Sequence, residues 1–523
     1  MLSRRAWVVV TGLLVAGGAF AVGLVLWPGG EEEAPRSATS RPTIVQDDAQ
    51  VLHRSTAEVR RTVRVLRGLG VDWLRVTANW SFIAPAPLSA ARPRFDASDP
   101  GAYPPGAWDR LDRAVHEARD AGLEVSIDIG FWAPRWAVAR PSPEPDRQRD
   151  GIDPAAFADF SAAVARRYGD RAAAYTIWNE PNYQVFLRPQ WRRTGQFAGE
   201  AGARRRLGGG RPSGGGSGGW EVASADAYRA MVYAAVPRIR AAAPRAVVLI
   251  GGTAALGTSA PSARTDQVPP LRFLRELACV DAALRPLRDG DCARFSPLPG
   301  DGWAHHPYAP RRPPDAGDPD PDTAVLADQG RLADLLDRLH AAGRTRSRLG
   351  LWVTEFGYET SPPDPTQPVS LAEQARWLPE AEAIALADPR VRSFAQFLFR
   401  DLPERPGVTE RERWGDFQSG LELPDGTDKP AMRAFAYPLT ASRAGPGRVR
   451  FWGRARPGTG RRLVRITADG RPVRQETTTE DGVFGFIAAA DPRATYRLQI
   501  RRDGAWTPVG VPLPGAHGPT VTS

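Results

Sequence analysis

The sequence predicts an α/β protein: a (β/α)8 TIM barrel with a small C-terminal all-β sandwich domain and an N-terminal transmembrane helix. Three observations lead to this prediction. Strand-like apolar segments alternate strictly with helical segments over 42–440, short alternating segments without helical periodicity fill 441–523, and an uninterrupted apolar run covers 6–27.

The barrel prediction rests on eight strand-like segments with a helical segment in each gap. Strict alternation implies right-handed crossovers and a parallel sheet. A doubly wound open sheet, the competing architecture, would usually carry a glycine-rich phosphate loop after its first strand, and the sequence "DDAQVLHRS" at that place is not one. The predicted strands are 42–49, 71–77, 123–129, 173–178, 246–252, 302–306, 349–355 and 393–399, and the predicted helices are 56–70, 107–122, 154–169, 224–244, 270–278, 323–343 and 371–387.

The remaining segments give three predicted domains. Residues 1–41 hold an anchor or signal peptide with a stalk rich in Pro, Glu and Ser, residues 42–440 the barrel, and residues 441–523 the β-sandwich. Within the barrel, the glycine-rich stretch 202–220 is expected to be a flexible insertion between the fourth and fifth strands.

The apolar run 6–27 predicts where the chain works. Its 22 residues are long enough to cross a bilayer, arginines precede it and acids follow it, so the bulk of the chain is expected outside the membrane. We favour an uncleaved, membrane-anchored extracytoplasmic protein. The alternative is a signal peptide cleaved after Ala19-Phe20-Ala21, which would give a secreted protein.

Composition narrows the function classes. The formal net charge is +10, but the arginines are scattered through the chain and the densest stretch, "ARRRLGGGR" at 203–211, is too short for a nucleic-acid arm. We therefore expect no nucleic-acid partner. Only two cysteines occur, Cys279 and Cys292, which in an exported chain predicts a disulfide that closes a local loop rather than a metal site.

Two carboxylates end predicted strands. Glu180 ends the fourth strand in "YTIWNEPN", and Glu355 ends the seventh in "LWVTEFGYET". Working residues of such barrels sit at the carboxyl ends of the strands, so closure brings both glutamates to one mouth. Two facing carboxylates without a set of metal ligands suit glycosidic bond cleavage, in which one donates a proton and the other attacks or activates water. We expect neither a metal nor a cofactor.

In "WNEP" and "TEFG" the chain resembles clan A of the retaining glycoside hydrolases, which includes cellulase-like and β-xylosidase-like families, over roughly 42–440. The resemblance implies that Glu180 is the acid/base and Glu355 the nucleophile. It also implies that Asn179 binds the 2-hydroxyl of the sugar, that Arg75 holds Glu355 ionised, and that His306 and Tyr308 of "WAHHPYAP" line the site, with the Tyr308 hydroxyl orienting the nucleophile.

Some nearby residues have two interpretations. A register error of one would exchange His305 with His306. Glu359, Asp47 and Asp48 are expected to be loop or rim groups rather than catalysts.

Aromatic residues are candidate sugar platforms, because the apolar face of a sugar stacks on an aromatic ring. Trp132, directly after the third strand, is the best placed. Clan A enzymes often end strand eight with a Trp, whereas this strand ends in "FLFRD", so Phe399 or Trp414 is expected to substitute. We expect about half of the following set to contact sugar and the rest to lie in the core: Trp80, Trp132, Trp136, Trp178, Trp191, Trp220, Trp303 and Trp414.

The sequence therefore predicts a retaining β-glycosidase that hydrolyses O-glycosidic bonds of an extracellular or cell-envelope polysaccharide. Two alternatives stay open: an exo-acting, β-xylosidase-like enzyme on small glycosides, and a non-catalytic glycan-binding protein of the cell envelope. The sugar, its linkage and the oligomeric state have no signal in the sequence.

Overall fold

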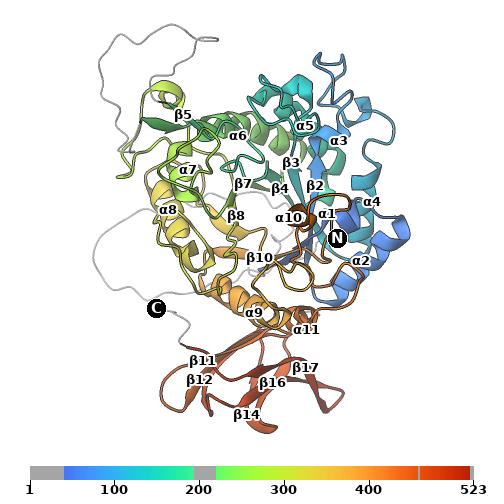
Figure 1. Cartoon of the computed structure of the whole chain (residues 1–523), viewed down its shortest axis with the longest axis vertical. Helices are drawn as coiled ribbons and strands as arrows, with labels where there is room; N and C mark the ends of the chain where they lie inside the picture. Colours follow the sequence, from blue (N-terminus) through green and yellow to red (C-terminus); the bar gives the residue numbers. More distant parts are fainter. Residues whose placement is uncertain (1–40, 194–218, 457–459, 519–523) are drawn as a thin grey trace, which may run out of the picture. The chain divides into compact units, whose positions relative to one another are not determined.

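A computed structural model describes residues 41–193, 219–456 and 460–518. Its centre is a closed barrel of eight parallel strands in the order β1-β10-β9-β8-β7-β4-β3-β2 (Figure 1). This confirms the predicted (β/α)8 barrel. The strands are β1 (Thr43–Gln46), β2 (Trp73–Asn79), β3 (Glu124–Gly130), β4 (Ala174–Ile177), β7 (Val247–Ala254), β8 (Gly302–His306), β9 (Gly350–Val353) and β10 (Val391–Phe397).

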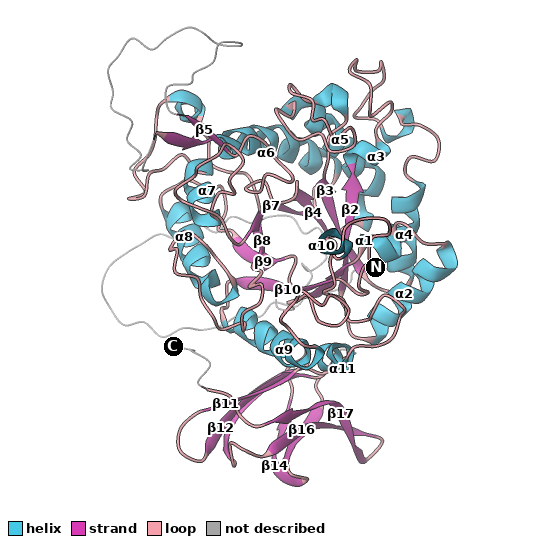
Figure 2. Cartoon of the chain, in the orientation of Figure 1, coloured by secondary structure: helices cyan, strands magenta, loops and turns pink. Residues whose placement is uncertain are grey.

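A ring of helices surrounds the strands (Figure 2). The helix predicted at 323–343 begins only at Gln329, because a 3-10 turn occupies Leu326–Asp328. The helices of the ring are α2 (Thr56–Gly68), α4 (Asp109–Asp120), α5 (Pro154–Tyr168), α6 (Ala223–Ala242), α7 (Pro270–Leu277), α8 (Gln329–Ala341) and α9 (Leu371–Ala387), and shorter helices are α1 (Asp48–Val51), α3 (Trp80–Ile83), α10 (Glu410–Arg413) and α11 (Pro430–Ala436).

Local sequence fixes several helix ends. Ser55 accepts a hydrogen bond from Glu58 N while the Glu58 side chain accepts from Ser55 N, which is a capping box, and Ser370 and Glu373 repeat this at the start of α9. Asp153 caps α5, whose first residue is a proline. Such caps satisfy N–H groups that otherwise have no partner in the first helical turn.

The C-terminal segment forms two antiparallel sheets, one of order β11-β12-β15 and one of order β14-β13-β16-β17, as the alternating pattern predicts. Two buried arginines of this domain, Arg454 and Arg456, pair with the buried carboxylate of Glu382 on α9. The strands are β11 (Leu439–Arg443), β12 (Arg448–Arg454), β13 (Leu463–Ala468), β14 (Arg471–Thr477), β15 (Val483–Ala489), β16 (Thr495–Arg502) and β17 (Ala505–Pro514).

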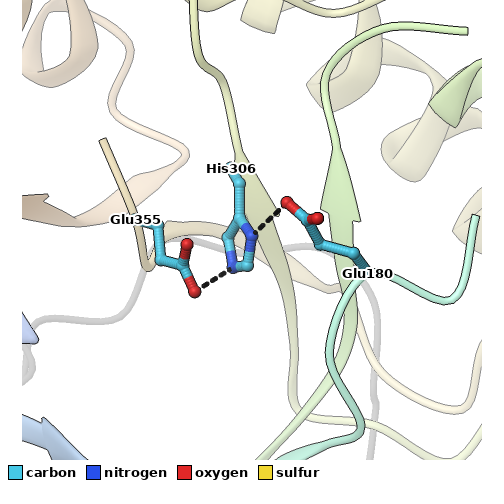
Figure 3. Close-up of side chains that lie close together, drawn as sticks. All are labelled: Glu180, His306 and Glu355. Carbon is cyan, nitrogen blue, oxygen red and sulfur yellow. Dashed lines mark hydrogen bonds and ion pairs between the residues drawn. The ribbon is translucent and has the colours of Figure 1, made fainter. Parts of the chain in front are cut away.

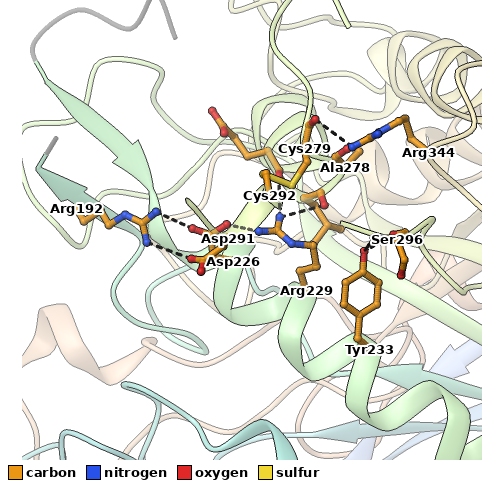
Figure 4. Close-up of a disulfide and its surroundings, with 12 residues drawn as sticks. Arg192, Asp226, Arg229, Tyr233, Ala278, Cys279, Asp291, Cys292, Ser296 and Arg344 are labelled. Carbon is orange, nitrogen blue, oxygen red and sulfur yellow. Dashed lines mark hydrogen bonds and ion pairs between the residues drawn. A yellow bond between two sulfur atoms is a disulfide. The ribbon is translucent and has the colours of Figure 1, made fainter. Parts of the chain in front are cut away.

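Cys279 and Cys292 form the predicted disulfide, with their Cα atoms 5.6 Å apart. The disulfide lies beside α6, where Arg229 donates to Leu277 O, and the Arg344 guanidinium donates to Cys279 O (Figure 4). The bridge thus closes a local loop on the ring of helices.

Two predicted segments, the membrane anchor and the glycine-rich insertion, lie wholly or mostly outside the described residues. No helix within the described ranges is long and apolar enough to cross a bilayer, and the anchor predicted at 6–27 lies outside those ranges. Most of the glycine-rich insertion, 202–218, also lies outside them. The described residues that flank it form a short antiparallel pair that the sequence analysis missed, β5 (Trp191–Arg193) and β6 (Trp220–Val222).

Candidate active site

Glu180 sits in an unusual turn at the carboxyl end of β4. The backbone of Trp178 has φ 62° and that of Glu180 has φ 37°, both in the left-handed region that non-glycine residues rarely adopt. Glu180 N donates to Gly252 O over 2.9 Å, and Asn182 Nδ2 donates to Ala254 O over 3.0 Å. Hydrogen bonds to β7 therefore hold the strained turn, and with it the direction of the glutamate side chain.

Glu355 follows β9 and is held from two sides. Arg75 Nη1 donates to Glu355 Oε1 over 2.6 Å, and the Tyr308 hydroxyl donates to Glu355 Oε2 over 3.2 Å. Arg75 is fully buried in the middle of β2, and Glu355 is 7% exposed. One cation and one hydroxyl donor therefore hold the Glu355 carboxyl group.

His306, the last residue of β8, lies between the two glutamates (Figure 3). Its Nδ1 is 2.9 Å from Glu180 Oε1, and its Nε2 is 3.6 Å from Glu355 Oε1. One oxygen of Glu180, one nitrogen of His306 and one oxygen of Glu355 all lie within 4.8 Å of one another. The two strand-end carboxylates therefore share one small site.

His305 has a different environment. Its Nδ1 is 2.9 Å from Thr253 Oγ1 and its Nε2 is 2.7 Å from Ala324 O, and burial lowers the pKa of His305 to about 4. It is thus a neutral core histidine with both nitrogens hydrogen-bonded. The structure places His306, and not His305, beside the glutamates.

Asn179 lies next to the same cation. It is 4% exposed, and its Oδ1 accepts a hydrogen bond from Arg75 Nη2 over 3.3 Å. Arg75 thus takes one of the two acceptor positions of the amide oxygen.

Burial shifts the pKa values of several site groups. It raises the pKa of Glu180 above its ordinary value, although the hydrogen bond with His306 acts in the opposite direction. Burial next to Glu355 also raises the pKa of Tyr308 well above that of free tyrosine. At neutral pH the Tyr308 hydroxyl is therefore a donor, and the environment of Glu180 favours its protonated form.

Gln46 and Asp128 also belong to the site, and neither was predicted from the sequence. Arg75 Nη1 also donates to Gln46 Oε1 at the end of β1, and Arg75 Nη2 lies 3.4 Å from Asp128 Oδ1 on β3. Asp128 is fully buried, its two oxygens have no hydrogen-bond partner among the described residues, and burial raises its pKa to about 7. The signal was an acid inside the apolar strand "VSIDI", where an unpaired charge would be costly.

Solved structures with a similar fold include glycoside hydrolases. No family model matches the chain, and no curated protein matches it. A solved family 39 glycoside hydrolase from the gut symbiont Bacteroides cellulosilyticus WH2 matches 86% of this chain and 81% of its own, with 15% identity and a TM-score of 0.50. The chain therefore has the same (β/α)8 barrel fold as this solved structure.

Two further structures match less closely. One is GH5_18 from Streptomyces cattleya in complex with GlcNAc, with 18% identity, coverage of 76% of this chain and 80% of that chain, and a TM-score of 0.43. The other is an FMN-binding beta-glucuronidase from Facaelibacterium prausnitzii L2-6, with 12% identity, coverage of 92% and 56%, and a TM-score of 0.41.

The cluster of Glu180, His306 and Glu355 also has the composition of a metal site. The charge around it is unfavourable to a cation, because the Arg75 guanidinium already occupies one oxygen of Glu355. A guanidinium at hydrogen-bond distance repels a metal ion and competes for the same lone pairs. The geometry therefore fits proton transfer and nucleophilic attack better than metal binding.

The strand-one acids have separate roles. Asp47 is fully buried, caps α1 by accepting from Gln50 N, and also accepts from Phe399 N and Arg400 N, so it ties the strand-one loop to the segment after β10. Asp48 is half-buried and accepts from Thr77 N over 3.1 Å. Backbone N–H groups therefore hold both carboxyl groups in place.

Glu359, in the loop after β9, is half-buried and accepts a hydrogen bond from Gln367 Nε2 over 2.8 Å. Burial raises its pKa to about 7.

The aromatic residue at the end of β10 is Phe397. Its ring is edge-on to Tyr308 with 6.4 Å between the centroids, which places it on the Glu355 side of the site. Phe399, two positions later, is 2% exposed and packs in the hydrophobic core, and Trp414 is half-buried directly after α10. Phe399 is thus a core residue, and a sugar contact of Trp414 stays a prediction.

Trp132 is half-buried after β3, and Trp132 Nε1 donates to Val185 O over 2.9 Å. The Arg147 guanidinium lies over its ring, 4.8 Å from the centroid, so a sugar stacking on that face would displace Arg147. Among the other candidate platforms, Trp136 and Trp220 are half-buried. The remaining four are at most 1% exposed and belong to the core: Trp80, Trp178, Trp191 and Trp303.

Proposed function

We propose that this chain is a retaining β-glycosidase that hydrolyses O-glycosidic bonds in an extracellular or cell-envelope polysaccharide. The observation that carries the proposal is the distance between the strand-end carboxylates, of which one oxygen from Glu180 and one from Glu355 lie within 4.8 Å. Retaining glycosidases hold their two carboxyl groups about 5 Å apart, whereas inverting enzymes separate them by about 6.5–9.5 Å to admit a water molecule. The short separation supports double displacement.

In the first step Glu355 attacks the anomeric carbon and the bond to the leaving oxygen breaks, while Glu180 gives its proton to that oxygen. In the second step Glu180 takes a proton from water, which attacks the glycosyl-enzyme and releases Glu355. Arg75 and Tyr308 orient Glu355, and burial favours the protonated form of Glu180. The different surroundings thus assign one role to each carboxyl group.

Two other candidates compete with this proposal. An exo-acting, β-xylosidase-like enzyme would use the same carboxylates on the end of a small glycoside, and product analysis separates the two because internal cleavage yields a spread of chain lengths. A non-catalytic glycan-binding protein would have no need of Arg75 and Tyr308 on Glu355. The contacts of Glu355 therefore favour catalysis.

The place of action is part of the proposal. Arginines before and acids after the apolar run 6–27 support a chain anchored in the membrane with its barrel outside. The disulfide supports an oxidising compartment, because such bonds are rare in the cytosol. Fractionation of cells, followed by protease treatment of intact cells, tests this placement.

The deciding experiment for the chemistry is a panel of mechanism-based probes that trap the retaining nucleophile, one for each sugar configuration. We expect one configuration to label Glu355, identified by peptide mass spectrometry. Glu355→Gln should lose labelling and hydrolysis, and Glu180→Gln should lose hydrolysis, while both keep the far-ultraviolet circular dichroism of the wild type. Hydrolysis that survives in both variants would refute the assignment.

A further inference from the structure

Lysine 429 is the only lysine in a chain with 69 lysine and arginine residues, and its side chain is completely enclosed. It lies at the start of α11. Its ammonium group donates hydrogen bonds to Thr360 Oγ1 at 2.9 Å, Asp401 Oδ1 at 2.8 Å and Gln418 O at 3.1 Å, and it lies 2.7 Å from Asp401 Oδ2. The ammonium therefore joins three segments, the loops after β9 and β10 and the start of α11.

The surroundings explain why this position holds a lysine in an arginine-rich chain. An ammonium is a compact charge with three donors, and here three oxygens receive them. A guanidinium is planar and larger, and it carries five N–H donors, so it would not fit an enclosed site of this kind without leaving donors unpaired.

One of these oxygens, Gln418 O, belongs to residues 417–421, which we name the 417–421 segment. Each of its residues has a backbone group bound by a buried side chain or by a neighbouring main chain. Gly420 also lies so close to Asp401 that a Cβ at 420 would come within 2.4 Å of Asp401 N. The hydrogen bonds are Leu402 N to Phe417 O, Lys429 Nζ to Gln418 O, Gln396 Nε2 to Ser419 O, Gly420 N to Asp401 Oδ1 and Lys429 N to Leu421 O.

This tightly held segment carries an exposed aromatic ring. Phe417 is 51% exposed, and its ring is edge-on to Phe397 with 5.2 Å between the centroids. Phe397 is in turn edge-on to Tyr308, whose hydroxyl donates to Glu355. The two phenylalanines therefore form a continuous aromatic surface that leads from the nucleophile outward.

We propose that Phe417 extends the sugar site as an aromatic wall next to Phe397, and that Lys429 is the positioning residue that holds this wall in place. The proposal rests on the proposed glycosidase function. The Phe417 ring is large, apolar and exposed, and its backbone is fixed. Covering it with the apolar face of a second sugar residue removes apolar surface from water, which favours binding. The ring thus recognises a unit beyond the one that is cleaved, which makes Phe417 a determinant for oligosaccharides over simple glycosides.

The test compares two substrates of the configuration that labels Glu355: an aryl monoglycoside and a series of oligosaccharides. Phe417→Ala should raise KM for the oligosaccharides by about tenfold, with kcat within twofold, and should raise KM for the aryl glycoside much less. Phe417→Tyr keeps the ring and should keep the wild-type KM. An unchanged oligosaccharide KM in Phe417→Ala would overturn the proposal that Phe417 contacts a second sugar residue.

The role of Lys429 is tested in a variant that also lacks the buried negative charge of Asp401. Lys429→Met alone leaves the Asp401 carboxyl group buried without a counter-charge and is expected to lower the melting temperature, so the kinetic variant is Lys429→Met together with Asp401→Asn. This pair should raise the oligosaccharide KM as Phe417→Ala does, and adding Phe417→Ala to it should cause no further rise, because both act through one wall. Lys429→Arg should not restore the wild-type KM.

Each outcome decides the proposal. A folded double variant with a lower melting temperature and an unchanged KM makes Lys429 only a stabilising residue. If the wild type hydrolyses nothing, the proposed function fails and the wall is tested separately, by calorimetric titration of the same oligosaccharides into wild type and Phe417→Ala. Equal affinity would then overturn the wall.

Discussion

Arg75 and Glu355 lie 280 positions apart in the sequence, yet Arg75 Nη1 donates to Glu355 Oε1 over 2.6 Å at the barrel mouth. The same guanidinium lies 3.4 Å from Asp128 Oδ1, so one buried cation serves two carboxyl groups from two other strands. Glu355 is therefore held by a residue that also pairs with a buried carboxyl group inside the barrel.

Arg75→Met should lower both activity and stability. It leaves buried acids without their cation, and the loss of one partner from a buried pair costs about 3–5 kcal/mol of unfolding free energy. We expect kcat/KM to fall at least about a hundredfold, measured on the substrate identified by the probe panel, and the urea midpoint to fall.

The matched control adds Asp128→Asn to Arg75→Met. Removing the second charge should restore most of the stability but none of the activity, because Glu355 still lacks its donor. Equal losses in the single and double variants would mean that Asp128 does not depend on Arg75.

The pH profile should identify Glu180 as the acid. Burial raises its pKa, and only the protonated form can donate a proton, so kcat/KM should fall as the pH rises through that raised pKa. Glu180→Ala, assayed with an aryl glycoside whose leaving group needs no proton, should lose this alkaline limb. A limb that persists in the variant belongs to another group.

His306→Ala should move the same limb. The hydrogen bond from His306 lowers the pKa of Glu180 against the effect of burial, so its removal should shift the alkaline limb to higher pH, and loss of orientation should lower kcat by roughly tenfold to a hundredfold. His305→Ala is the neighbouring control: it removes a core side chain and should lower stability without moving the limb. A shift in the His305 variant alone would contradict the placement of His306.

Removing the disulfide should affect stability and not catalysis. The bridge closes a loop with a sequence separation of 13, for which the loss of chain entropy in the unfolded state corresponds to about 3 kcal/mol. Cys279→Ser with Cys292→Ser should melt at a lower temperature, as should the reduced wild type, with kcat and KM unchanged because the loop packs on α6 and not on the glutamates. A change in KM would show coupling between this loop and the site.

The sequence predicts the parts of this molecule that depend on local patterns. The strands were readable because each is an apolar run bounded by turn residues, and Glu180 and Glu355 stood out as acids where such runs end. Barrel closure then follows from the alternation, and it places both glutamates at one mouth.

What escaped prediction depends on register and on distant contacts. Phe397 and Phe399 have the same residue type two positions apart, and only the backbone path at the end of β10 decides which of the two lies next to Tyr308. Asp128 joins the site through Arg75, a contact between neighbouring strands that no local pattern encodes. The 417–421 segment has no secondary structure of its own, so its order comes entirely from tertiary hydrogen bonds.

The enclosure of Lys429 also has a practical consequence for handling the protein. Amine-directed reagents such as activated esters and aldehydes need a free, accessible amine, and the only lysine side chain offers none in the folded state. Coupling at lysine side chains should therefore report unfolding rather than modify the native surface. Attachment to a solid support is better directed to carboxylates or to an engineered surface cysteine.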